Sequence, residues 1–313
     1  MNLEGEKMEY QEKYNYAGWK NCIRLSNGKI ELVATTDVGP RIIRFAELNG
    51  KNLFKEFKDQ VGQTGGSDWR SYGGIRFWHG PEASPRCYYP DNFPVESSWD
   101  GKTLQLSQET EKTTGIKKEI EVSLSEKDNH VKMVYKLINN NLWDIELAPW
   151  AISVMAEGTM AIIPQEPFQT WEEKFSPVRP LTLWAYTKMQ DPRWTWGDKY
   201  IRLRQDPKSS SRQKIGVFNS AGWVAGYNNG EILIKRYNCD PEFIYPDFGC
   251  NTEIYTDSDI LELETLGQLV ILEPGAKLEY TEDLFYFKKQ IENTDQSIDE
   301  NLLPLVKETD KFF

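Results

Sequence analysis

Short segments of alternating apolar and polar residues, separated by turn residues, constrain this chain more than any other feature. Three such segments follow one another between residues 102 and 139, and a period of two is that of a β-strand with one buried face. Asn49-Gly50 and Asn228-Asn229-Gly230 are typical hairpin turns. Strands at this spacing, with little helix between them, favour an all-β fold, and we expect residues 1–313 to form one large antiparallel β-sandwich.

The same pattern predicts where other strands and one helix lie. Strands are predicted over residues 29–36, 41–48, 53–57, 145–155, 200–204, 214–218, 222–227, 231–237, 252–256, 260–266, 268–272 and 277–287. Pro149 lies inside one of them, which indicates a strand that is bent, bulged or at a sheet edge. Near-helical spacing of apolar residues predicts a short C-terminal helix over about 289–304. We expect residues 1–20 to form an ordered lead-in.

Two long stretches have no clear period. Residues 58–100 and 164–200 combine glycine and proline with many aromatic residues, and the second holds five prolines and four tryptophans. Long irregular segments in a compact domain are usually functional or disordered. So many large apolar rings argue against disorder, and we interpret the first stretch as an ordered loop excursion over one end or face of a sheet and the second as a similar excursion.

Composition excludes several classes of partner. A net charge of -11 with no basic run disfavours nucleic acid and anionic membranes. Residues 1–20 lack the order of a signal peptide, and no apolar run is long enough to span a bilayer, so we expect a cytoplasmic protein. The four cysteines are far apart without a CxxC pair, which predicts reduced thiols, no metal site and no cofactor. The 11 Trp, 15 Tyr and 14 Phe suit both a thick core and a sugar-stacking platform.

One segment gathers several chemically useful side chains. Gly73–Glu82 contains Arg76, Trp78, His79 and Glu82, and His79 is one of only two histidines. Its glycines and proline indicate a backbone that is neither a plain strand nor a helix. The structural interpretation is a turn with His79 bound to backbone and Trp78 in the core. The functional interpretation is proton transfer by His79 and Glu82.

Several segments together resemble the galactose mutarotase-like (aldose 1-epimerase) superfamily over about residues 25–287. The matching segments are Val38–Ile43, Gly73–Pro81, Gly249–Tyr255, Leu261–Gly267 and Leu272–Gly275. The resemblance implies a β-supersandwich of two large antiparallel sheets with a sugar site on a concave face. It also implies a mechanism in which a glutamate removes the anomeric proton and a histidine protonates the ring oxygen, with no metal or cofactor.

The resemblance assigns roles to individual residues. Glu253 matches the catalytic glutamate. The segments that carry the family's two histidines contain Asn92 and Trp150 here and no histidine, which leaves His79 as the acid. The expected substrate-binding residues are Arg41, Arg76, Trp78, Glu82, Asn92, Trp150 and Arg193.

Each of these assignments has a structural alternative. Arg41 and Arg76 suit a sugar hydroxyl, carboxylate or phosphate, or else an internal ion pair. Trp78 and Trp150 are either stacking platforms or core residues, and Arg193 is expected at the rim of the site. Glu262 and Glu264 alternate with leucines and are interpreted as solvent-facing.

Three function classes follow. The first is a mutarotase or epimerase for an unusual or acidic sugar, with Glu253 as base and His79 as acid. The second is a carbohydrate-binding protein without activity. The third is a glycoside hydrolase or polysaccharide lyase, for which Glu82 and Glu253 are the nominated pair of carboxylates. The ligand is a sugar or sugar acid in each case, the sequence does not fix the oligomeric state, and the site residues should converge on one concave pocket.

Overall fold

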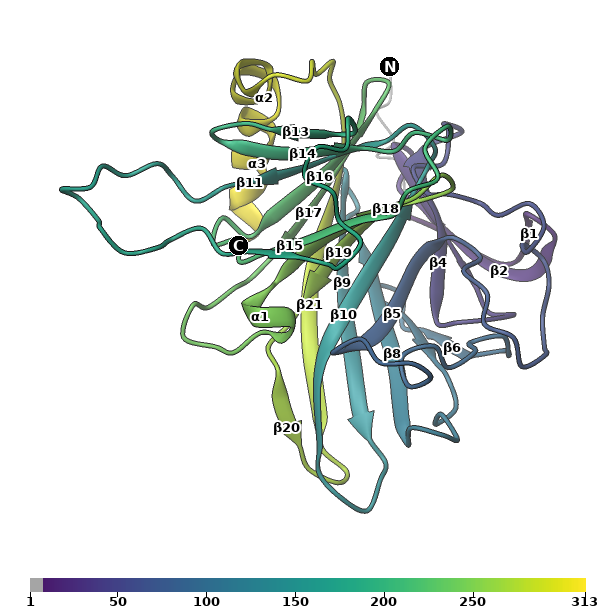
Figure 1. Cartoon of the computed structure of the whole chain (residues 1–313). Coiled ribbons are helices and arrows are strands. Elements are labelled where there is room, and N and C mark those ends of the chain that lie inside the picture. The colour runs from purple at the N-terminus through teal and green to yellow at the C-terminus, as the bar shows by residue number, and fades with distance from the viewer. Residues whose placement is uncertain (1–7) are drawn as a thin grey trace, which may run out of the picture.

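Antiparallel strands make up most of the regular secondary structure (Figure 1). The computed structural model describes residues 8–313, which form two antiparallel sheets, of eleven and ten strands. The order of strands across the first sheet is β1 (Glu9–Tyr16), β2 (Trp19–Ser26), β3 (Ile30–Thr35), β4 (Arg41–Glu47), β5 (Gly74–Gly80), β10 (Ile145–Met155), β19 (Leu261–Leu266), β18 (Thr252–Thr256), β15 (Gln213–Val217) and β12 (Leu181–Leu183), and β20 (Val270–Leu272) also pairs with β10.

The second sheet faces the first across one large core. Its order is β13 (Trp194–Trp196), β14 (Tyr200–Arg204), β11 (Met160–Pro164), β16 (Trp223–Asn228), β17 (Glu231–Tyr237), β21 (Lys277–Lys288), β9 (His130–Asn139), β8 (Ile116–Leu124), β7 (Leu104–Ser107) and β6 (Glu96–Trp99). Phe77 of β5 meets Tyr135 of β9 with ring centroids 4.9 Å apart. The predicted all-β fold of two large antiparallel sheets is confirmed.

Short helices at the C-terminus cover the other face of the second sheet. They are α2 (Asp295–Asn301), α3 (Leu303–Glu308) and the 3-10 turn η1 (Thr309–Phe312). Ile298 and Leu302 pack in a cluster with Phe285 of β21. The helical tail was predicted six residues too early because its start is set by Thr294, whose side chain accepts a hydrogen bond from the Ser297 amide. One further single turn, α1 (Pro246–Gly249), lies in a loop.

Strand β5 corrects the expectation that Gly73–Glu82 is neither strand nor helix. All seven residues of β5 are buried strand. Gly73 and Gly74 have φ of 92° and 72°, and a Cβ on Gly74 would lie 2.1 Å from the Ile42 carbonyl oxygen. The glycines therefore permit a sharp, close-packed entry to a strand rather than preventing one.

Pro149 was expected to mark a bend, a bulge or a sheet edge, and the edge interpretation is wrong. Strand β10 lies between β5 and β19 in the first sheet. The Pro149 carbonyl accepts from the Gly267 amide at 2.9 Å, so its nitrogen points to the same side, where β10 changes partner from β19 to β20. No hydrogen bond to β5 is lost, and proline is tolerated in a central strand.

The N-terminal lead-in is an added pair of strands. Of the expected lead-in, residues 9–16 form β1 and residues 19 and 20 begin β2, whereas residues 1–7 lie outside the described part of the chain. No helix within residues 8–313 is long and apolar enough to cross a membrane. All four cysteines are free thiols, as predicted.

Candidate functional site

The outer face of the first sheet carries a cavity of about 370 Å³. Side chains alternate between the two faces of a strand, so Arg76 and Trp78 of β5 point outward while Ile75 and Phe77 enter the core between the sheets. Trp150 on β10 points outward in the same way. The sheet therefore supplies the floor of the cavity.

The irregular stretches supply its walls. Trp69 and Tyr88 come from residues 58–100, and Trp184 and Tyr186 from residues 164–200. With Trp78, Trp150 and Tyr255 these seven rings define what we name the aromatic cavity. Trp78 meets Tyr88 with centroids 4.8 Å apart and Trp150 with centroids 5.3 Å apart, both edge to face, so the rings hold one another in place.

A buried lysine connects the cavity to two glutamates. Nζ of Lys214 on β15 lies 2.8 Å from Oε2 of Glu253 and donates to Oε2 of Glu264 at 2.9 Å. Trp150 Nε1 donates to the same Glu264 oxygen at 2.9 Å. The Lys214 ammonium is 4.8 Å from the ring centroids of both Trp150 and Trp184, a sandwiched cation–π contact. Lys214 lines the cavity, and both glutamates are fully buried behind it.

A second ion pair lies beside the first. Arg76 Nη2 donates to Glu262 Oε1 at 2.7 Å, and Arg76 Nη1 donates to Ser71 Oγ at 3.1 Å. The guanidinium carbon is 4.7 Å from the Trp78 ring centroid and 5.2 Å from that of Trp69. Glu262 lines the cavity although only 7% of it is exposed.

Burial and neighbouring charges shift the pKa values of the charged residues on the cavity floor. Burial raises the pKa of Glu253 well above its usual value, against the effect of Lys214. Burial also raises the pKa of Glu262 to about 7, although Arg76 opposes the shift. For Lys214, burial alone would lower the pKa, but Glu253 and Glu264 outweigh it and hold the pKa well above its usual value. Groups that exchange protons near neutral pH are typical of functional sites.

Five of the nine predicted site residues meet here. Arg76, Trp78, Glu82 and Trp150 line the cavity, and Glu253 contacts it through Lys214. Glu82 is exposed and accepts a hydrogen bond from the Tyr88 hydroxyl. The remaining four residues lie elsewhere.

His79 does not share this site, and the expectation that it meets Glu253 in one pocket is wrong. It follows Phe77 on the inward-facing side of β5, between the sheets, and is 1% exposed. Its Nε2 lies 3.7 Å from Glu111 Oε2, and Glu111 pairs with Lys118 at 2.6 Å. Burial lowers the pKa of His79. The other histidine, His130, is 2.6 Å from Asp283 on the second sheet.

Arg41 and Asn92 support the wall rather than line the cavity. Arg41 is fully buried, pairs with Asp91 at 2.6 Å and donates to the carbonyls of Ser71 and Gly73. Asn92 donates to the Asp68 carbonyl at 2.7 Å and accepts from the Tyr72 hydroxyl at 2.9 Å. Both side chains pair with backbone and side-chain groups of residues 58–100, which for Arg41 is the internal ion pair given above as its structural alternative.

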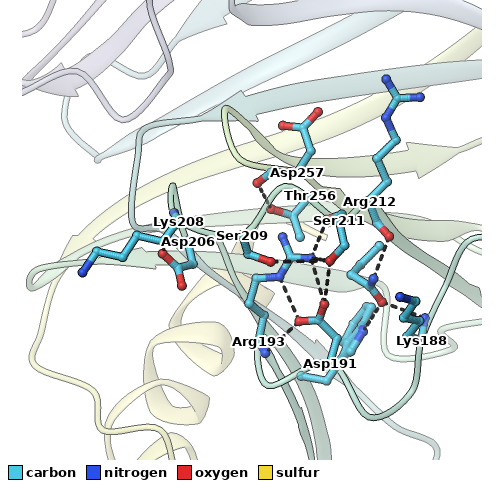
Figure 2. Close-up of polar contacts among 12 residues, drawn as sticks. Lys188, Asp191, Arg193, Asp206, Lys208, Ser209, Ser211, Arg212, Thr256 and Asp257 are labelled. Atoms are coloured by element: carbon cyan, nitrogen blue, oxygen red, sulfur yellow. Dashed lines mark hydrogen bonds and ion pairs between the residues drawn. The ribbon is translucent and has the colours of Figure 1, made fainter.

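Arg193 acts on the cavity only through its neighbours. Figure 2 shows its guanidinium turned toward Asp191 and Ser211, while the side chain of Arg212 extends away from this cluster. Arg193 Nε donates to Asp191 at 2.9 Å, and Nη2 donates to Ser211 Oγ at 2.8 Å. Ser211 precedes Arg212, which lines the cavity. Arg193 thus fixes the backbone behind the rim instead of occupying the rim.

Sequence reasoning missed three charged residues of the floor. Glu262 and Glu264 were interpreted as solvent-facing, and that interpretation is wrong because both are buried. Lys214 was not considered at all. A signal was available: a sheet that is covered on both faces has no solvent face, and the two irregular aromatic stretches predict such a cover. A charged residue in a strand beneath that cover must be paired.

Comparisons with known proteins address the fold. No protein-family model matches the chain. An Escherichia coli K12 protein provisionally named an aldose 1-epimerase has a similar structure, with a TM-score of 0.58 and 12% identity over 85% of this chain and 98% of that one. A galactose mutarotase-like protein from Lactobacillus casei gives a TM-score of 0.55 and 10% identity over 85% and 100% of the two chains.

A larger protein is also similar. A TPR-domain containing protein from Parabacteroides distasonis gives a TM-score of 0.57 and 14% identity over 87% of this chain. The present chain spans 48% of the length of that protein. Together these likenesses show that the chain has the galactose mutarotase-like fold, as the sequence motifs predicted.

Proposed function

We propose that the aromatic cavity binds a carbohydrate. The observation that carries this proposal is the set of seven aromatic rings around a hollow of about 370 Å³ whose floor holds paired charges. Aromatic faces pack against the C–H faces of sugar rings, while charged and hydroxyl groups bind the hydroxyls between them. The names of the structural neighbours, aldose 1-epimerase and galactose mutarotase-like protein, point to the same class of ligand.

Binding to a panel of sugars tests the proposal. Saturation-transfer NMR across neutral, amino and acidic monosaccharides should identify at least one ligand of the wild-type protein. Trp184 is only partly buried and stands on the wall, so Trp184→Ala should weaken binding roughly tenfold, the effect of about 1.4 kcal/mol of lost contact. Trp196→Ala is the matched control, because Trp196 stacks on Trp194 outside the cavity. Equal losses in the two variants would contradict the proposal.

Anomer exchange is a second candidate, favoured by the two carboxyls with raised pKa. Mutarotation needs one group that removes a proton and one that supplies it. We propose Glu262 on the cavity floor in place of His79, together with Glu253, which the superfamily resemblance implies and which reaches the cavity through Lys214. Saturation exchange between α and β anomers would detect the activity, and Glu262→Gln should slow it about 100-fold or more if Glu262 transfers a proton. Exchange at the buffer rate for every bound sugar would leave binding alone.

A further inference from the structure

The floor of the aromatic cavity has more carboxyl groups than cations. We call Arg76, Lys214, Glu253, Glu262 and Glu264 the buried floor, since each is at most 7% exposed. Two cations therefore face three carboxyls. Asp247 of α1, half-buried, is a fourth carboxyl beside Glu253, and burial raises its pKa. Like charges in a low-dielectric site oppose one another's ionisation.

The contacts of the buried floor show where the excess lies. Glu262 uses Oε1 for Arg76, and Glu264 uses Oε2 for both Lys214 and Trp150. Oε1 of Glu253 is buried and has no hydrogen-bond partner within residues 8–313. A buried oxygen left in this state is costly unless it holds a proton or receives a donor.

No buried cation remains for an anionic ligand. Arg76 and Lys214 are both committed to carboxyls of the floor. Arg212, the other cation on the cavity wall, is exposed, so solvent screens its charge. Glu82 and Asp257 also line the cavity, and neither forms an ion pair within the described residues. Even without Glu253, whose pKa is raised, the four carboxyls of Glu82, Asp257, Glu262 and Glu264 outnumber the three cations Arg76, Lys214 and Arg212. A sugar carboxylate or phosphate would add to this excess.

A cation would instead restore the balance. Aromatic rings attract cations through their faces, and nearby carboxyls add direct attraction. We propose that the aromatic cavity selects a sugar that carries a protonated amino group, with the ammonium beside Glu262 and the sugar ring against the aromatic wall. This inference rests on the proposed carbohydrate binding and names the class of sugar. It replaces the sugar acid expected from the sequence.

Calorimetric titration of the wild-type protein at pH 7 tests the inference. The probes are glucosamine, galactosamine and mannosamine, each beside its parent hexose and, for the first two, the matching uronate. We expect at least one hexosamine to bind about tenfold more tightly than its parent hexose and the uronates to bind more weakly than either. Equal affinities, or tighter binding of a uronate, would overturn this inference and leave the proposed function standing. Binding of none of these sugars would overturn both.

Variants that remove one negative charge from the cavity show which carboxyl produces the preference for an amino sugar. Glu262→Gln should remove most of the tenfold preference for the amine over the neutral hexose. If loss of the Arg76 partner prevents folding, Glu82→Gln, also in the cavity lining, should reduce the same preference by a smaller factor. Glu172→Gln, an exposed position in residues 164–200 outside the cavity, is the matched control and should change nothing. A preference that survives in both Glu262→Gln and Glu82→Gln would overturn the inference.

Discussion

The two sides of strand β5 carry two buried ion clusters of opposite character. On the inner side, His79 lies near Glu111, which pairs with Lys118 at 2.6 Å. On the outer side, Arg76 pairs with Glu262 at 2.7 Å on the floor of the aromatic cavity. The inner cluster balances one carboxyl with one lysine and is sealed between the sheets, whereas the outer cluster has excess carboxyls and meets a hollow.

The pKa values of the buried glutamates differ between the two clusters in the same way. Burial would raise the pKa of Glu111, but Lys118 and His79 outweigh it and hold the pKa far below its usual value. On the outer side, burial wins and raises the pKa of both Glu253 and Glu262. A buried cluster that only stabilises the fold reaches charge balance, whereas a cluster that stays unbalanced beside a cavity has the character of a binding site.

The largest predicted effect concerns the inner cluster. Glu111→Gln should lower the free energy of unfolding by about 3–5 kcal/mol, because Lys118 would stay buried without its counter-charge. Urea unfolding measures the loss. Glu109→Gln, two residues away and exposed, is the control and should change stability by less than about 0.5 kcal/mol. A loss below about 1 kcal/mol in Glu111→Gln would remove the contrast between the clusters.

The second prediction concerns pH. Glu262 keeps its proton up to a pH of about 7 in the folded state, whereas the unfolded chain releases it near 4.5. Stability therefore falls as pH rises from about 4.5 to 7, by up to about 1.4 kcal/mol per pH unit from this group. Glu111 has the opposite sign, because its contribution is present above its unfolded pKa and is lost as pH falls through its lowered folded pKa.

Comparison of the wild type with Glu262→Gln isolates the contribution of Glu262 to this change of stability with pH. The difference in the free energy of unfolding between the two proteins should change steadily between pH 5 and 7 and then level off. Glu126→Gln, at an exposed turn, should run parallel to the wild type throughout. Parallel curves for the wild type and Glu262→Gln would show that Glu262 has an ordinary pKa.

The smallest predicted effect concerns Glu253. Burial raises its pKa well above the usual value, and glutamine is nearly isosteric with a protonated glutamate. Glu253→Gln should therefore change stability by less than about 1 kcal/mol, although Glu253 is as buried as Glu111. Urea unfolding at pH 7 decides the matter. A loss comparable to that of Glu111→Gln would mean that Glu253 is ionised and that the outer cluster is balanced by other means.

The fold was predictable because the alternation of apolar and polar residues and the preferences of turn residues depend only on short stretches of sequence. Alternation between residues 102 and 139 and the turn at Asn228–Gly230 specify strands without reference to the rest of the chain. The ordered motifs then predicted the galactose mutarotase-like fold, which the similar solved structures confirm. Pairing across the sheet was not predictable, since Arg41 and Arg76 lie opposite each other in β4 and β5 although 35 positions apart in sequence.

The site was only partly predictable from the sequence. The face of the sheet on which a strand residue lies depends on the strand's register, and its exposure depends on which loops cover that face. His79 and Trp78 are adjacent in sequence, yet one points between the sheets and the other into the cavity. The segment Gly73–Glu82 was identified as important, but its histidine was assigned to the wrong face. Lys214 and Glu264 gave no local signal, because their roles arise only when β15 and β19 come together around β18.

We propose that a sugar binds on the outer side of β5 and not on its inner side. Titration of ¹⁵N-labelled protein with the tightest-binding sugar, followed through the tryptophan indole N–H signals, tests it most directly. Signals of Trp69, Trp78, Trp150 and Trp184 should shift with a common saturation curve, while Trp19 and Trp223, buried elsewhere, should not move. Shifts confined to indoles outside the cavity, with the four cavity signals unchanged at saturation, would contradict the account.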